Sequence, residues 1–105
     1  MPRVKVKYFG RLRSLLGIKY EFYEVSKGTM LKDLLLFEIP QRHRNVSEIW
    51  RQEMFRIVKG EILFNEDGTP VLDSYIVLTR GRTPSLRSRL KEEDELMILP
   101  PLYGG

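Results

Sequence analysis

The segment that most constrains the fold is the apolar run near the end of the chain. Residues 96–99 are all apolar, and Pro100 and Pro101 follow at once. A strand that is apolar on both faces is typical of a position inside a sheet. Because proline cannot donate a ladder hydrogen bond, this strand must end at or near Leu99. The chain is therefore expected to leave its domain directly from an interior strand.

The first 25 residues predict a strand, a short helix and a second strand. Residues 3–9 alternate apolar and basic side chains, which is the period of a half-buried strand. Residues 11–16 have the apolar spacing of a short helix, and Gly17 can end it. Residues 20–25 then form a second strand, with either Tyr20 and Phe22 or Tyr23 and Val25 facing inward.

Apolar spacing predicts two helices in the middle of the chain. The first has Thr29 as its N-cap and is expected to end at Pro40. The second begins at Asn45, with Glu48 three residues later, continues its apolar face to residue 58 and has Gly60 as its C-cap. We expect the following side chains of this helix to be in the core rather than in a partner groove: Trp50, Met54 and Ile57.

The remaining segments complete an α+β roll. Residues 61–64 and 71–72 flank an Asp-Gly turn, residues 75–78 form a strand before a turn at Gly81, and residues 91–94 form a charged turn before the final strand. The order of elements predicts a mixed sheet with helices packed on one face. We expect one domain over residues 1–99 and an extended tail over residues 100–105.

Composition excludes several kinds of site. The chain has no cysteine, so it has neither a disulfide nor a thiolate for catalysis or metal binding. His43 is the only histidine, which excludes metal sites built from several imidazoles, and its arginine-rich surroundings predict a surface loop. No apolar stretch approaches the ~20 residues that span a bilayer, and no secretory signal opens the chain. We therefore expect no metal, no membrane partner and a cytoplasmic location.

The net charge of +4 permits an acidic partner. Basic residues are spread along the chain up to the stretch from Arg80 to Lys91, and acids follow further on. This distribution is typical of a solvated surface rather than of a nucleic-acid stripe, so we expect no nucleic-acid partner.

The last six residues have the properties of a reactive tail. Pro100 and Pro101 favour an extended backbone, and residues 101–105 can reach about 17 Å from the domain. Gly104 and Gly105 carry no side chains, so a narrow channel could admit them, and the only reactive group left is the carboxylate of Gly105. A free carboxylate must be activated before a nucleophile can attack it. Because the sequence has no phosphate-binding glycine loop, a partner must supply the activation.

Several segments resemble the family of ubiquitin-like sulfur carriers (MoaD/ThiS), and most of all its molybdopterin synthase small-subunit branch. They are VKVKYFGRLRSLLG at 4–17, GTMLKDLLL at 28–36, YIVLTRGR at 75–82 and LKEEDELMILPPLYGG at 90–105. The last of these is similar to the family's ending in Pro-Pro-x-x-Gly-Gly. The region 38–72 is longer than is typical of the family, and the additional residues could serve a different partner.

The resemblance implies a β-grasp fold and a carrier rather than an enzyme. A ubiquitin-activating-type enzyme would use ATP to adenylate Gly105, and a sulfur donor would then convert the adenylate to a thiocarboxylate. The large subunit of molybdopterin synthase, or another sulfur acceptor, would receive the sulfur. The carrier itself would bind no cofactor stably. By this resemblance the tail that enters the partner comprises Pro100, Pro101, Leu102, Tyr103 and Gly104.

Three alternative functions stay open at this point. The chain could be a protein modifier joined to its targets through Gly105, or it could carry sulfur for thiamine or for tRNA thiolation. It could also be a basic binding module that uses the strand cations and the arginines of residues 80–89. A docking surface beside the tail is expected to include Phe9, Leu99 and Arg82.

Overall fold

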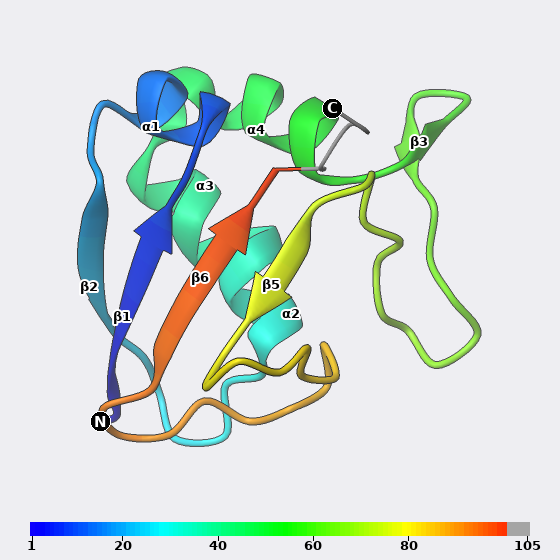
Figure 1. Cartoon of the computed structure of the whole chain (residues 1–105). Helices are drawn as coiled ribbons and strands as arrows, with labels where there is room; N and C mark the ends of the chain where they lie inside the picture. Colours follow the sequence, from blue (N-terminus) through cyan, green and yellow to red (C-terminus); the bar gives the residue numbers. More distant parts are fainter. Residues whose placement is uncertain (101–105) are drawn as a thin grey trace.

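A four-stranded mixed sheet forms the centre of the molecule (Figure 1). The computed structural model describes residues 1–100. Its strands lie in the order β2-β1-β6-β5, where β1 is Arg3–Tyr8, β2 is Tyr20–Glu24, β5 is Ile76–Leu78 and β6 is Glu95–Leu99. β6 runs parallel to β1 and antiparallel to β5, and β1 and β2 are antiparallel. The apolar last strand therefore lies inside the sheet, as its composition predicts.

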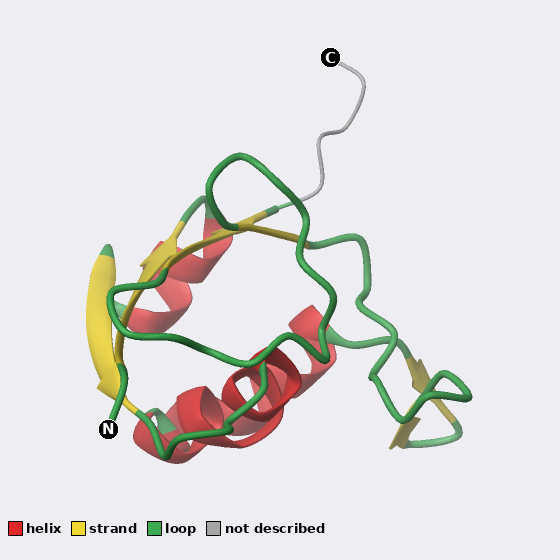
Figure 2. Ribbon diagram, turned by 90° about the horizontal axis from the view of Figure 1, so that it is seen from below, coloured by secondary structure: helices red, strands yellow, loops and turns green. Residues whose placement is uncertain are grey.

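Helices cover one face of this sheet and leave the other open (Figures 1 and 2). They are α1 (Arg11–Leu16), α2 (Leu31–Asp33), α3 (Ile39–Arg42) and α4 (Ser47–Met54), with a π turn, η1 (Leu34–Glu38), and a 3₁₀ turn, η2 (Arg44–Val46). A small hairpin of β3 (Ile57–Val58) and β4 (Glu61–Ile62) stands beside the sheet. This is the predicted α+β roll. No helix within residues 1–100 is long and apolar enough to cross a membrane.

The core lies between the sheet and the helices. From β2 and the residue after it, Tyr23 and Val25 point inward, each 1% exposed, which resolves the orientation that the sequence leaves open. Trp50 and Met54 of α4 are fully buried, as predicted, and Ile57 packs against the core while half-buried. The ring of Trp50 meets that of Tyr8 edge to face, with centroids 6.4 Å apart. This contact joins the helical layer to β1.

The helical segment that starts at α2 does not end at Pro40, contrary to the prediction. The π turn η1 precedes α3, and the backbone N–H of Ile39 donates to the carbonyl of Leu34, five residues back. Pro40 then lies in the first turn of α3, where a missing N–H costs little. The wider turn therefore carries the chain through a residue that normally stops a helix.

The predicted helix over residues 45–58 is too long at its C-terminal end. α4 ends at Met54, and Phe55 is already extended, with φ −118° and ψ 151°. The β-branched residues Ile57 and Val58 form β3 instead, and Gly60 occupies the turn of the hairpin rather than a helix C-cap. Cross-strand pairing replaces the helical bonds that the apolar spacing suggests.

Both predicted N-caps lie one residue away from the observed ones. Met30 caps α2, and its N–H donates to Asp33 Oδ2 at 2.9 Å. The carbonyl of Thr29 instead accepts a hydrogen bond from the Leu90 N–H at 2.8 Å. For α4 the cap is Val46, because the preceding 3₁₀ turn already includes Asn45.

Candidate functional site

The end of β6 meets the start of α1 at a close contact. Gly10 has φ 61° and ψ −134°, and a Cβ added there would lie 2.9 Å from Cγ of Pro100. Residues with a side chain rarely adopt this backbone conformation, and the space above it is already filled. Glycine at position 10 therefore allows Pro100, the residue after β6, to pack against the turn between β1 and α1. The contact fixes the direction in which the described chain ends at Pro100.

A polar cleft of about 480 Å³ opens beside this contact. It is lined by Arg11, Gln52, Glu53, Asp73, Ser74, Tyr75 and Pro100. At its centre, the Tyr75 hydroxyl donates to Glu53 Oε1 at 2.6 Å, and Arg11 Nε lies 3.5 Å from Glu53 Oε2. The lining offers charged and hydrogen-bonding groups, and it contains no cysteine or histidine. The cleft is therefore suited to hold polar groups of a partner that surrounds the end of the chain.

The open face of the sheet carries an apolar patch at the same end. We call it the outer patch, and it comprises Phe9, Ile76, Leu78, Met97 and Leu99. Ile76 is 39% exposed and pairs with Leu99, and Leu78 pairs with Met97. The guanidinium of Arg13 lies 4.8 Å from the ring centroid of Phe9. Below the patch, Lys7 and Glu95 form an ion pair at 2.6 Å and neutralise each other.

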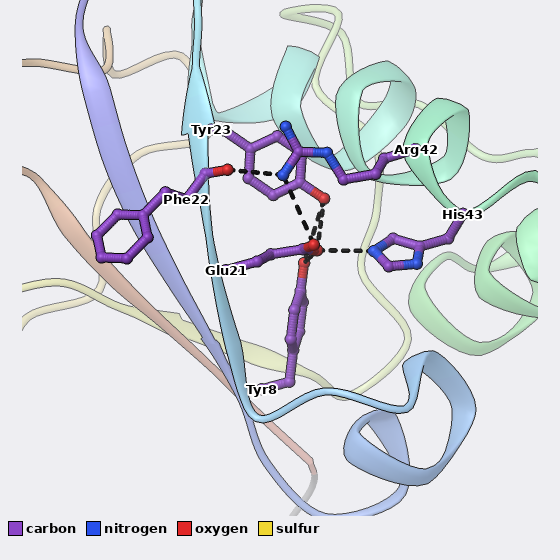
Figure 3. A network of polar contacts seen from close by, with 6 residues as sticks. All are labelled: Tyr8, Glu21, Phe22, Tyr23, Arg42 and His43. Atoms are coloured by element: carbon purple, nitrogen blue, oxygen red, sulfur yellow. Dashed lines mark hydrogen bonds and ion pairs between the residues drawn. The ribbon is translucent and has the colours of Figure 1, made fainter.

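A buried carboxylate supports this end of the sheet from the core side (Figure 3). Glu21 Oε2 accepts hydrogen bonds from the hydroxyls of Tyr8 and Tyr23, both at 2.6 Å, and lies 2.7 Å from His43 Nε2. Arg42 adds a guanidinium 3.6 Å from Glu21 Oε1 and donates to the carbonyl of Phe22 at 2.6 Å. The network joins β1 and β2 to the turn after α3.

The environment of this network shifts the acidity of its members. Burial alone would raise the pKa of Glu21, but hydrogen bonds from Tyr23, Tyr8 and His43 outweigh it and lower that pKa below its usual value. Burial raises the pKa of Tyr8, and the neighbouring Tyr23 and Glu21 add to the effect. Burial likewise raises the pKa of Tyr23. His43 is thus part of a structural network with a side chain 16% exposed, not a residue of an exposed loop.

Comparison with known proteins identifies the family of this chain. No family model matches the chain. A solved structure from Pyrococcus furiosus, described as molybdopterin converting factor, subunit 1, is 33% identical, has a TM-score of 0.68 and covers 97% of this chain and 100% of its own. The chain belongs to the family of ubiquitin-like sulfur carriers.

Two further proteins are similar to this chain. The molybdopterin synthase sulfur carrier subunit of Chlamydomonas reinhardtii is 26% identical to this chain over 103 residues, which are 98% of this chain and 99% of that protein. The crystal structure of the small archaeal modifier protein 1 of Haloferax volcanii has a TM-score of 0.68 at 20% identity and covers 97% of this chain and 100% of its own. The last likeness is one of fold alone. The β-grasp fold implied by the sequence is confirmed.

The structure brings together some of the predicted site residues and separates others. Phe9 and Leu99 lie at the end of the sheet that holds Pro100, because Tyr8 and Ile98 are paired directly before them. Arg82 does not lie there. Its bridge partner Thr79 follows β5, whose last residues pair toward the beginning of β6. The tail residues 101–105 lie outside the described residues.

Sequence reasoning missed three residues of the site, Gly10, Glu53 and Tyr75. Gly10 follows a strand and an aromatic residue, which marks a turn but not a contact with residue 100. Only the parallel pairing of β1 with β6 places the two side by side. Glu53 and Tyr75 are far apart in the sequence and meet only in the folded chain. The glycine after the first strand is the one sequence signal that could have indicated a residue of this site.

Proposed function

We propose that this chain carries sulfur as a thiocarboxylate on Gly105 and donates it in molybdopterin synthesis as the small subunit of molybdopterin synthase. The observation that supports the proposal most is that the interior strand β6 leads to Pro100, which packs on Gly10, and that the sequence after it ends in Gly-Gly. A tail with a fixed origin and no terminal side chains suits a narrow active site in another protein.

The chemistry takes two steps, and both need a partner. A ubiquitin-activating-type enzyme joins the Gly105 carboxylate to AMP from ATP and releases pyrophosphate. Hydrosulfide, or its equivalent on a sulfur donor, then attacks the acyl carbon and displaces AMP, which leaves a thiocarboxylate. This chain contributes the carboxylate and the surface that the enzyme holds, and it binds no ATP itself. It acts as a carrier.

The partners are proposed to dock on the outer patch and around the polar cleft. The patch is apolar, and Lys7 and Glu95 below it neutralise each other, so a partner that binds there buries mainly apolar surface. The cleft beside Pro100 offers Glu53 and Arg11 to the rim of the partner's channel. Because both surfaces lie at the end of the sheet that holds Pro100, one partner can cover them together while the tail enters its active site.

The intact mass of the protein tests the proposal. We expect incubation with ATP, a sulfide source and the adenylating enzyme to add the mass of one oxygen exchanged for sulfur, and deletion of Gly105 to abolish the gain. A chain with Gly105 in an isopeptide bond to other proteins would favour the modifier function instead. An unchanged mass with an active enzyme would contradict both.

A further inference from the structure

All of the net positive charge of the molecule comes from one segment. Residues 79–91, here called the arginine segment, contain five cations and no acid. They are Arg80, Arg82, Arg87, Arg89 and Lys91. The whole chain has a net charge of +4, so the remaining residues sum to −1. The segment connects β5 to the turn before β6, at the end of β6 opposite to Pro100 (Figure 1).

The charges of the arginine segment are not neutralised by ion pairs. All five cations are exposed, and none of them is in an ion pair with another residue of the described chain. Three cations on the sheet and helices do form ion pairs: Lys7 with Glu95, Arg11 with Glu53 and Arg51 with Glu48. The net positive charge of the chain is therefore concentrated at one place on the surface.

The backbone of the segment is held in place. The N–H groups of Leu31 and Lys32 donate to the carbonyls of Ser88 and Leu86, both at 2.8 Å, and the Leu90 N–H donates to the carbonyl of Thr29 at 2.8 Å. Leu90 is 5% exposed. Arg87 and Arg89 lie between these anchored residues, so a ligand that binds them loses little free energy to ordering of the backbone.

A tight turn presents the first two arginines. Thr79 and Arg82 exchange backbone hydrogen bonds at 2.8 and 3.0 Å, and the two residues between them, Arg80 and Gly81, have φ 52° and 74°. Two left-handed residues in this position form a type I′ turn, in which asparagine or glycine is preferred to arginine. An open hollow of about 560 Å³ is lined by Thr79, Arg80, Arg82, Thr83 and Pro84. An arginine is thus placed where backbone conformation disfavours it.

We propose that the arginine segment binds the phosphodiester backbone of nucleic acid. Arginine, lysine, serine and threonine are the side chains that contact phosphates, and together they make up most of the segment. The segment has no aromatic residue to stack on bases or to anchor a protein interface. Binding would therefore depend on charge and not on base sequence. It would leave the opposite end of β6 free, so it does not depend on the sulfur-carrier proposal.

Salt dependence is the first test. We would measure the affinity of the full chain for a fluorescent RNA hairpin and for a DNA hairpin of the same length. The salt concentration would be varied from about 20 to about 200 mM. Five phosphate contacts predict a log–log slope of roughly −3.5 to −4.5. The ratio of the two affinities identifies the preferred nucleic acid. Tighter binding to polyglutamate than to either hairpin would overturn the proposal and indicate an acidic protein partner.

Matched variants locate the contact. We expect the double variant Arg87→Gln, Arg89→Gln to bind at least about tenfold more weakly and to reduce the slope by roughly 1.5. The control variant Lys19→Gln, Arg44→Gln removes the same charge from two other exposed positions and should keep the affinity within about twofold. Equal losses in both variants would show that net charge alone attracts the nucleic acid, and would overturn the proposal.

Arg80→Asn separates binding from folding. Asparagine suits the left-handed turn better than arginine, so the variant should unfold at the same or a higher temperature while it binds the hairpin several-fold more weakly. A structural role for Arg80 predicts the reverse, a lower unfolding temperature with unchanged affinity. That result would contradict a phosphate contact at the turn.

Discussion

The two ends of β6 differ in what they present to solvent. At one end, Pro100 packs on Gly10, the outer patch is apolar, and Lys7 below it is paired with Glu95. At the other end, the arginine segment is polar, and its cations have no ion-pair partners within the described chain. A central strand thus separates two surfaces that suit partners of different chemistry. The comparison predicts that substitutions at one end leave the function of the other intact.

The largest effect is expected at Gly10. Gly10→Ala adds a Cβ 2.9 Å from Pro100 Cγ in a backbone conformation that alanine disfavours. We expect a loss of about 3 kcal/mol in the free energy of unfolding and slower thiocarboxylate formation. Gly17→Ala is the control, because Gly17 also has a positive φ of 72° but has open space around it, and it should cost about 1 kcal/mol. Equal costs in urea unfolding would show that the contact with Pro100 is unimportant.

Loss of the buried carboxylate should have the next largest effect. Glu21→Gln leaves two tyrosine hydroxyls and His43 with a neutral acceptor in a nearly enclosed site. We expect the free energy of unfolding to fall by about 2 kcal/mol. Glu48→Gln, which breaks an exposed pair with Arg51, should change it by less than about 0.5 kcal/mol. Similar losses in the two variants would show that the Glu21 network does not stabilise the end of the sheet that holds Pro100.

The pH dependence of stability sharpens the same point. The pKa of Glu21 is lowered in the folded state, so its contribution is complete above its unfolded value near 4.3 and is lost as the pH falls through the folded value. The pKa values of Tyr8 and Tyr23 are raised, so their contribution is complete below about pH 10 and is lost above it. Urea unfolding from about pH 2 to 11 measures both limbs. Glu21→Gln should flatten the acidic limb, and an unchanged limb would assign it to other carboxylates.

The smallest effect is expected on the outer patch. Phe9→Ala should weaken binding to the adenylating enzyme about tenfold, which corresponds to about 1.4 kcal/mol. Phe37→Ala removes an aromatic ring that is 53% exposed on the helical side, and it should leave the affinity unchanged. Titration calorimetry with the two variants compares the faces. Equal affinities would place the docking surface elsewhere.

The sequence predicts the sheet well because its signals are local. Alternation identifies β1, Gly17 ends α1, and the apolar run before Pro100 identifies an interior strand. It predicts less of the region over residues 38–72. There, a π turn carries the helix past Pro40, and cross-strand pairing takes Ile57 out of the helical register. Both outcomes depend on neighbours that a local pattern does not contain.

The candidate site is predicted only in part for the same reason. The Gly-Gly ending is visible in the sequence, but its support is not, because Gly10 and Pro100 meet through a pairing of strands from the two ends of the chain. Glu21 and His43 meet across a turn and a helix in the same way. Arg82 lies close to the final strand in sequence, yet the turn at Gly81 leaves it at the end of β6 far from Pro100.

Discharge of the carrier tests the central claim most directly. The thiocarboxylated protein would be mixed with the large subunit of molybdopterin synthase and the cyclic pyranopterin precursor, and its intact mass would be followed over time. We predict that the mass returns to that of the carboxylate as dithiolene product forms, and that the Gly10→Ala variant discharges more slowly than Gly17→Ala. Product formed while the carrier keeps its sulfur, or sulfur lost without product, would contradict the account.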